Sequence, residues 1–242
     1  MPISPRAPRL ANFLEKDTFA FMGGMSTSGS LTTWFRDRFA QAEVESEKSG
    51  GENAYAILAK EAAESPAGAK GLIALPYFEG ERTPLQDPAA KGVLFGLNLK
   101  HTRGDIYRAI LEGLGYALKD GTRTLQKRNR IKIESLRVSG GGSQSDAAMQ
   151  ITADIFNLPA QRPHTHETSA LGAAIDAAVG LKLHPDFDSA IRDMTRVANT
   201  FEPIPRNRDL YHELYERVYR KLYRRLKPIY SDIRAITGYP AL

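Results

Sequence analysis

Three consecutive glycines, Gly140-Gly141-Gly142, constrain the fold of this chain more than any other feature. They follow the segment 136–139, which predicts a strand, and they precede a predicted helix at 146–156. A ligand can approach such a turn closely because glycine has no Cβ, and the helix start offers unpaired N–H groups. The residues alone leave two interpretations level: a nucleotide or anion site, or a tight turn without a ligand.

Strands and helices alternate along the chain, which predicts an α/β fold. The expected strands are 18–22, 71–78, 92–97 and 136–139, and the expected helices are 31–42, 55–64, 105–126, 146–156, 170–181 and 208–230. Asp105 is a candidate helix cap, and Pro228 is expected to break the last helix. The polar stretch 43–53 is expected to be an exposed loop, and residues 1–8, with three prolines, to be irregular.

Absent residue types exclude several chemistries. The 242 residues include no cysteine, which excludes disulfides, thiolate nucleophiles and cysteine-ligated zinc. His164 and His166 form a pair without further ligands at a useful spacing, so no metal site is expected there. No apolar run is long enough to span a membrane, and the first residues lack the apolar core of a signal peptide. We therefore expect a cytoplasmic protein without a membrane partner.

The net charge of +5 is concentrated near the C-terminus. Residues 206–227 hold eight lysines and arginines against three acidic residues, and the remaining chain is balanced. Basic residues interleaved with aromatic ones can bind single-stranded nucleic acid. An amphipathic helix that packs a Leu/Tyr face on the body and leaves its Lys/Arg face in water is the more common pattern. We therefore expect no nucleic-acid partner, and nucleic-acid binding remains the alternative for this segment.

Two further loops are polar and follow predicted strands. Residues 26–30 offer hydroxyl and backbone N–H groups that suit phosphate oxygens, although Ser30 is equally a candidate N-cap. Glu79, Glu81 and Arg82 follow the strand at 71–78. Arg82 either binds phosphate, orders the loop through a carboxylate, or forms a structural ion pair that holds the turn.

Several spaced segments together resemble the C-terminal half of the FGGY carbohydrate kinases, nearest to the xylulokinase-like branch. The similarity extends from about Arg9 to Tyr230, and its motifs occur in the family's order. The motifs are Phe21-Met22-Gly23-Gly24, 29–34, the PYxxGERTP-like stretch at 75–84, the second signature at 92–97 and 105–112, the adenosine loop at 138–145, and Glu167 with 171–174.

This resemblance implies a ribonuclease H-like, actin-type ATPase domain at 9–242, with a mixed sheet flanked by helices. It implies ATP and Mg²⁺ as cofactors and a sugar or polyol as the phosphate acceptor. Gly29 and Thr33 would lie near the nucleotide phosphates, and Tyr55 near the adenine edge. The adenosine pocket would be lined by Gly140, Gly141 and Ser145, where relatives often carry asparagine at position 145. Arg82 would shape the substrate cleft.

The family's catalytic aspartate, its first C-terminal strand and its sugar-binding N-terminal half have no counterpart in this chain. The resemblance therefore implies the nucleotide-binding half of a kinase that transfers the ATP γ-phosphate to a sugar or polyol hydroxyl. No catalytic residue is assigned to this chain, which we expect to be inactive without the N-terminal lobe. That lobe, or a homodimer mate, is expected to cover the open sheet edge. The alternative is a non-catalytic nucleotide-binding or interaction remnant of a split or truncated gene.

Overall fold

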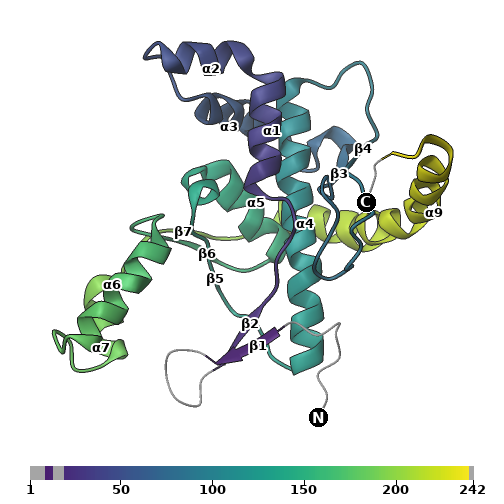
Figure 1. Cartoon of the computed structure of the whole chain (residues 1–242). Coiled ribbons are helices and arrows are strands. Elements are labelled where there is room, and N and C mark those ends of the chain that lie inside the picture. The colour runs from purple at the N-terminus through teal and green to yellow at the C-terminus, as the bar shows by residue number, and fades with distance from the viewer. Residues whose placement is uncertain (1–8, 13–18, 240–242) are drawn as a thin grey trace.

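The strands of this protein form three small sheets around one long helix, α4 (Figure 1). The computed structural model describes residues 9–12 and 19–239, so the expected irregular segment 1–8 lies outside it. The strands are β1 (Arg9–Asn12), β2 (Phe19–Met22), β3 (Ile73–Leu75), β4 (Val93–Phe95), β5 (Leu136–Arg137), β6 (Ala160–Pro163) and β7 (Val197–Phe201). The predicted α/β class is confirmed. The sheets are ordered β1-β2, β3-β4 and β5-β6-β7, and the third is mixed, since β6 runs parallel to β5 and antiparallel to β7.

The helices account for most of the remaining described chain. They are α1 (Gly29–Phe39), α2 (Gln41–Lys48), α3 (Ala54–Glu64), α4 (Arg103–Asn129), α5 (Asp146–Phe156), α6 (Thr168–Gly180), α7 (Phe187–Met194), α8 (Pro205–Leu214) and α9 (Arg220–Thr237). A π-helical turn at Tyr215–Tyr219 joins α8 to α9. None of the described helices is both long and apolar enough to cross a lipid bilayer.

Asp105 stabilises the start of α4, but it is not the N-cap. That position belongs to Thr102, whose side chain accepts a hydrogen bond from the Asp105 N–H, while the Asp105 carboxylate accepts from the Thr102 N–H. This reciprocal pair is a capping box, which satisfies two helix-end donors. Asp105 also accepts hydrogen bonds from Ser65 Oγ (2.6 Å) and Lys70 Nζ (2.9 Å). It therefore ties the segment before β3 to α4.

The prediction of a loop at 43–53 is wrong, because α2 occupies most of that stretch. Glutamate, alanine and lysine favour helix, and Lys48 pairs with Glu45 at 2.7 Å one turn away. Glu47 accepts a hydrogen bond from the N–H of Ala54 at 2.9 Å and thereby links α2 to the start of α3. The expectation of exposure holds, since α2 buries none of its residues.

The predicted break at Pro228 is also wrong, because α9 continues through this residue to Thr237. Proline removes one helical hydrogen bond, but Pro228 and Arg224, whose carbonyl loses that bond, are both exposed to water. Packing on either side holds the helix, through Tyr223 on Asp87 and Tyr230 on the Lys91 carbonyl. The irregularity of this region lies instead in the π turn.

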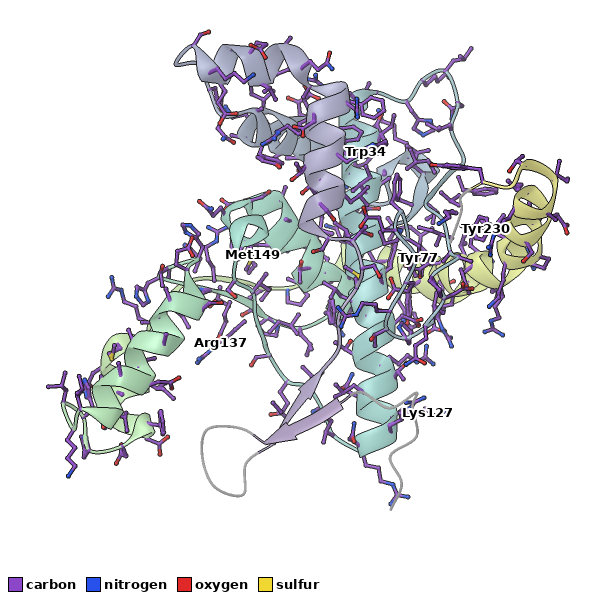
Figure 2. All side chains as sticks on the ribbon, in the orientation of Figure 1. Trp34, Tyr77, Lys127, Arg137, Met149 and Tyr230 are labelled. Carbon is purple, nitrogen blue, oxygen red and sulfur yellow. The ribbon has the colours of Figure 1, made fainter. Side chains whose placement is uncertain are left out.

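Tyrosines form the buried face of the C-terminal helices. Of the expected Leu/Tyr face, Leu222 and the four tyrosines Tyr211, Tyr215, Tyr219 and Tyr223 are buried, whereas Leu210 is 40% exposed. Tyr219 packs on Tyr116 of α4, with ring centres 5.0 Å apart. Tyr77 and Tyr230 lie on the same side of the molecule as α9 (Figure 2). The buried rings of α8, the π turn and α9 thus belong to the core and offer no stacking surface for nucleic-acid bases.

The predicted apolar face of α4 is only partly buried. Ile110 and Ala117 lie in the core, and Gly113 packs so close to Ala74 of β3 that a Cβ would lie 2.5 Å from the Ala74 carbonyl oxygen. Leu118 continues the same stripe but is 46% exposed. The core therefore ends part of the way along α4, and an apolar surface remains beyond it.

Candidate functional site

The glycine turn after β5 folds as a 3₁₀ turn, Gly141–Gln144, that leads directly into α5. Gly140 has a φ of +82°, a conformation that glycine adopts without strain, and its N–H donates to the His166 carbonyl at 3.2 Å. A Cβ at Gly141 or Gly142 would meet no heavy atom within 4 Å. The outer surface of the turn is therefore open, and a ligand can reach its backbone.

Ser145 is the N-cap of α5, and its Oγ accepts a hydrogen bond from the Ala148 N–H at 3.3 Å. The hydroxyl hydrogen remains available to donate to a ligand. Arg162 of β6 fixes this turn, because its Nε donates to the Ser143 carbonyl and its Nη2 pairs with Asp146, both at 2.6 Å. The sequence carries no signal for this role of Arg162, which lies nineteen residues from Ser143 and in no recognisable motif. Arg137 and Met149, on β5 and α5, flank the turn in the chain (Figure 2).

The loop between β2 and α1 supplies a second open helix start. Helix α1 begins at Gly29, and its N-cap is Ser28, which makes no side-chain hydrogen bond. The prediction that Ser30 is the N-cap is wrong, because the Ser28 carbonyl already accepts the N–H of Leu31 at 3.1 Å. A Cβ at Gly29 would meet no heavy atom within 4 Å. The first turn of α1 can therefore approach an anion closely.

Thr33 and Tyr55, both assigned to the nucleotide by the resemblance, are in direct contact. Their hydroxyl oxygens lie 2.8 Å apart, which links α1 to α3. Arg36 lies over the Tyr55 ring, with its guanidinium carbon 4.7 Å from the ring centre. Since α3 also packs against α5, this pair and the glycine turn belong to neighbouring helices. Thr33 and Tyr55 thus form one group, and Gly140, Gly141 and Ser145 form another.

Arg82 lines a separate pocket of about 240 Å³. One wall comes from Gly23 and Gly24, which follow β2, another from Arg82 and Thr83, and the third from α4 with Leu118 and Gly121. Within the described residues Arg82 forms no ion pair, so the structural ion pair expected for it is not found among them. The physical reason is that Glu81 turns into the core, where its Oε1 accepts the Thr83 N–H at 2.9 Å.

The histidine pair is used locally. The His164 N–H donates to the Arg196 carbonyl at 3.0 Å, and His166 lies 3.2 Å from Glu167. The described part of the chain contains no cluster of three or more His, Cys, Asp or Glu residues that could hold a metal ion. Mg²⁺ commonly keeps several waters and binds through substrate phosphates with one or two carboxylates, so it does not require such a cluster.

Comparison with known proteins identifies the family. Residues 4–181 match the model of the C-terminal domain of the FGGY family of carbohydrate kinases, and the chain belongs to that family. It is 33% identical over 204 residues to a xylulose kinase of Staphylococcus epidermidis, and 32% identical over 185 residues to a glycerol kinase of Limosilactobacillus reuteri. These matches cover 84% and 76% of this chain but only 39% and 35% of the relatives.

A solved structure agrees with this assignment. The crystal structure of xylulose kinase from Rhodospirillum rubrum superposes with a TM-score of 0.80 at 33% identity. It matches 94% of this chain and 44% of its own length. The actin-like ATPase fold implied by the resemblance is therefore confirmed, and the chain corresponds to the C-terminal part of a carbohydrate kinase.

Proposed function

We propose that this chain is the nucleotide-binding half of an ATP-dependent kinase that transfers a phosphoryl group to a sugar or polyol hydroxyl. The observation that carries the proposal is the open glycine turn at the start of α5. A Cβ at Gly141 would meet no heavy atom within 4 Å, and a helix N-terminus follows the turn directly. A ligand can approach such a turn closely, because glycine has no Cβ. The residues present therefore suit a nucleotide.

The proposed roles follow the two groups of residues described above. Gly140, Gly141 and Ser145 bind the adenosine, and Ser145 has a hydroxyl hydrogen to donate. Gly29 and Thr33 lie toward the phosphates, where the first turn of α1 stabilises negative charge. Tyr55, which the resemblance assigns to the adenine edge, joins the phosphate-side group in this proposal because its hydroxyl contacts that of Thr33. When MgATP is bound, Mg²⁺ neutralises charge on the phosphate oxygens.

We propose that catalysis requires the N-terminal half of the kinase, which supplies the aspartate base and most of the sugar contacts. Phosphoryl transfer depends on positioning the two reactants between lobes, and one lobe cannot do this alone. Among the described residues β1 pairs only with β2, and β5 pairs only with β6, so both present an open edge. Such edges are normally covered. Leu118 of α4, which is 46% exposed, adds apolar surface that the same lobe would bury.

A mixing experiment tests this function. We expect the purified chain to bind MgATP and to form no ADP in the presence of D-xylulose or glycerol. Addition of the N-terminal half of the Rhodospirillum rubrum xylulose kinase should produce sugar-dependent ADP formation. Turnover by the chain alone would contradict the proposal, as would a failure to bind ATP. Binding without activity in the mixture would instead favour a non-catalytic remnant. The cytoplasmic location remains a prediction.

A further inference from the structure

The loop after β3 closes as a narrow hairpin whose tip, residues 82–86, borders the 240 Å³ pocket. Glu81 and Asp87 form its base through two backbone hydrogen bonds, with N-to-O distances of 2.9 and 2.8 Å. Asp87 is in turn fixed to α9, because its carboxylate accepts hydrogen bonds from Tyr223 and from Lys227, the latter at 2.9 Å. The base of the hairpin is therefore fixed to α9, whereas Arg82 at the tip forms no ion pair within the described residues.

Glu81 is buried at this base, and its carboxyl group is incompletely satisfied. The side chain is 3% exposed, and its Oε1 accepts the Thr83 N–H at 2.9 Å. Its Oε2 is buried and has no hydrogen-bond partner within the described residues. The next residue, Arg82, is exposed, lines the pocket and forms no ion pair there. The buried Glu81 carboxyl group, with one oxygen unpartnered, is thus adjacent in sequence to the exposed Arg82 that lines the pocket.

The surroundings of Glu81 disfavour its ionised form. Asp120 of α4 faces it with a negative charge, and the phenols of Tyr77 and Tyr219 contribute no positive charge. Arg82 is the one cation acting on it, and it lies on the water side. Burial raises the pKa of Glu81 to about 7, with a further increase from Asp120, against the lowering effect of the two following backbone N–H groups. An ionised carboxylate with so few donors is costly in such a site.

We propose that Glu81 is a positioning residue, whose neutral carboxyl group holds the loop tip so that Arg82 faces the pocket and binds an anion the size of a phosphate group. When Glu81 ionises, its charge gains most by reaching water, and the tip that carries Arg82 and Thr83 must move to allow this. The pocket then loses one of the two arginines that line it, and Arg128 of α4 is the other. Anion affinity therefore falls as the pH rises through about 7. This inference rests on the proposed kinase function only for the biological source of the phosphate.

Sulfate is the appropriate probe, because it carries two negative charges throughout the relevant pH range. If only the form with neutral Glu81 binds, a group that titrates near pH 7 should lower sulfate affinity about tenfold between about pH 6 and about pH 8. Calorimetric titration of the whole chain measures this ratio. Glu81→Gln keeps the acceptor for Thr83 and cannot ionise, so its sulfate affinity should be the same at both pH values.

Two further variants and one spectrum make the test decisive. Glu79→Gln removes the same charge from an exposed position two residues earlier, and it should titrate sulfate as the wild type does. Arg82→Ala should weaken sulfate binding at least tenfold, while Arg128 still lines the pocket. The amide proton of Thr83 should shift with a midpoint near pH 7 in the wild-type NMR spectrum and remain constant in Glu81→Gln.

Three results would each overturn the inference. These are no sulfate binding by the wild type at pH 6, unchanged binding by Arg82→Ala, or a pH-dependent affinity in Glu81→Gln. ATP binding is measured separately, at the glycine turn. Loss of ATP binding with a normal sulfate titration would therefore contradict the kinase function and leave the role of Glu81 intact.

Discussion

The Tyr211 hydroxyl donates a hydrogen bond to Glu112 Oε1 at 2.7 Å, which joins α8 to α4 across 99 residues of sequence. Arg108 completes the cluster, since its Nη2 donates to the Tyr211 hydroxyl at 2.9 Å and its Nε to Glu112 Oε1 at 2.8 Å. The Gly68 N–H donates to the same carboxyl oxygen at 3.0 Å. Burial raises the pKa of Glu112, and these donors oppose that increase. The second signature, which carries much of the family resemblance, thus acts here as a structural anchor.

The first prediction concerns Tyr211→Phe, which keeps the buried ring and removes only the hydroxyl group. Both Arg108 and Glu112 lose a partner in a site without water access, so the free energy of unfolding should fall by about 2–3 kcal/mol. Urea denaturation at neutral pH measures this difference. Tyr239→Phe is the matched control, because Tyr239 is 76% exposed, and it should change stability by less than about 0.5 kcal/mol. Equal stability of the two variants would show that the cluster contributes nothing.

The lowered pKa of Asp105 should account for part of the loss of folding stability at low pH. Burial favours the neutral acid, but hydrogen bonds from Ser65, Thr102 and Lys70 outweigh this and hold the pKa of Asp105 well below its usual 3.8. A group whose pKa is lowered on folding stabilises the native state above its unfolded pKa. That stabilisation is lost as the pH falls below about 3.8 toward the folded value.

Asp105→Asn should therefore be less stable than the wild type at pH 6, and the difference should shrink at pH 3. Urea denaturation at the two pH values measures both differences. Asp232→Asn is the control, since Asp232 is exposed on α9, and it should match the wild type throughout. A gap between Asp105→Asn and the wild type that is independent of pH would contradict the assignment.

A substitution at Leu118 distinguishes the folding of this chain from its proposed association with the N-terminal half of a kinase. It is 46% exposed on α4, so Leu118→Lys should leave the unfolding free energy of the isolated chain within about 0.5 kcal/mol. If the N-terminal half buries this surface, as we propose, the same charge should weaken association by tenfold or more. Leu181→Lys, at a residue 73% exposed beyond α6, is the control. Association unaffected by Leu118→Lys would place the docking surface elsewhere.

Local sequence patterns predicted the elements whose signals are local. The strand, three glycines and helix at 136–156 could be read directly, because a short apolar run, a glycine turn and a helical period follow one another. Helix α2 escaped prediction because it buries no residue and so has no apolar periodicity. The predicted helix break at Pro228 was wrong because tertiary packing decides whether the carbonyl that loses its hydrogen bond is exposed to water. The Leu/Tyr face expected for the last helix is the face that α8 and α9 bury, with Tyr211, Tyr215 and Leu222 in the core.

The candidate site was less accessible to sequence reasoning. The spacing of Gly140, Gly141 and Ser145 along one turn is local, and the structure shows that turn open. The contact between Thr33 and Tyr55 joins two helices and has no local signal. Glu81 looks like an exposed turn residue, since its neighbours are charged, yet the hairpin folds it into the core. The burial of the Glu81 carboxyl group depends on how the whole hairpin folds, so the local sequence does not predict it.

Substitutions at two glycines of the glycine turn after β5 should differ in their effect on the stability of the fold. Gly140→Ala places a side chain at a φ of +82°, so it should destabilise the fold by about 1–3 kcal/mol. Gly141→Ala adds a Cβ with no heavy atom within 4 Å, so its stability should stay within about 0.5 kcal/mol of the wild type. Thermal unfolding distinguishes the two. Similar stability losses would contradict the described geometry of the turn.

The affinity of the chain for MgATP tests the central claim most directly, measured by calorimetry on the wild type and on Gly141→Ala. Gly180→Ala is the control, because its added Cβ also meets no heavy atom, at the end of α6. The account predicts that the wild type and Gly180→Ala bind MgATP with equal affinity, and that Gly141→Ala binds at least tenfold more weakly while remaining folded. No binding by the wild type, or equal binding by all three, would contradict the account.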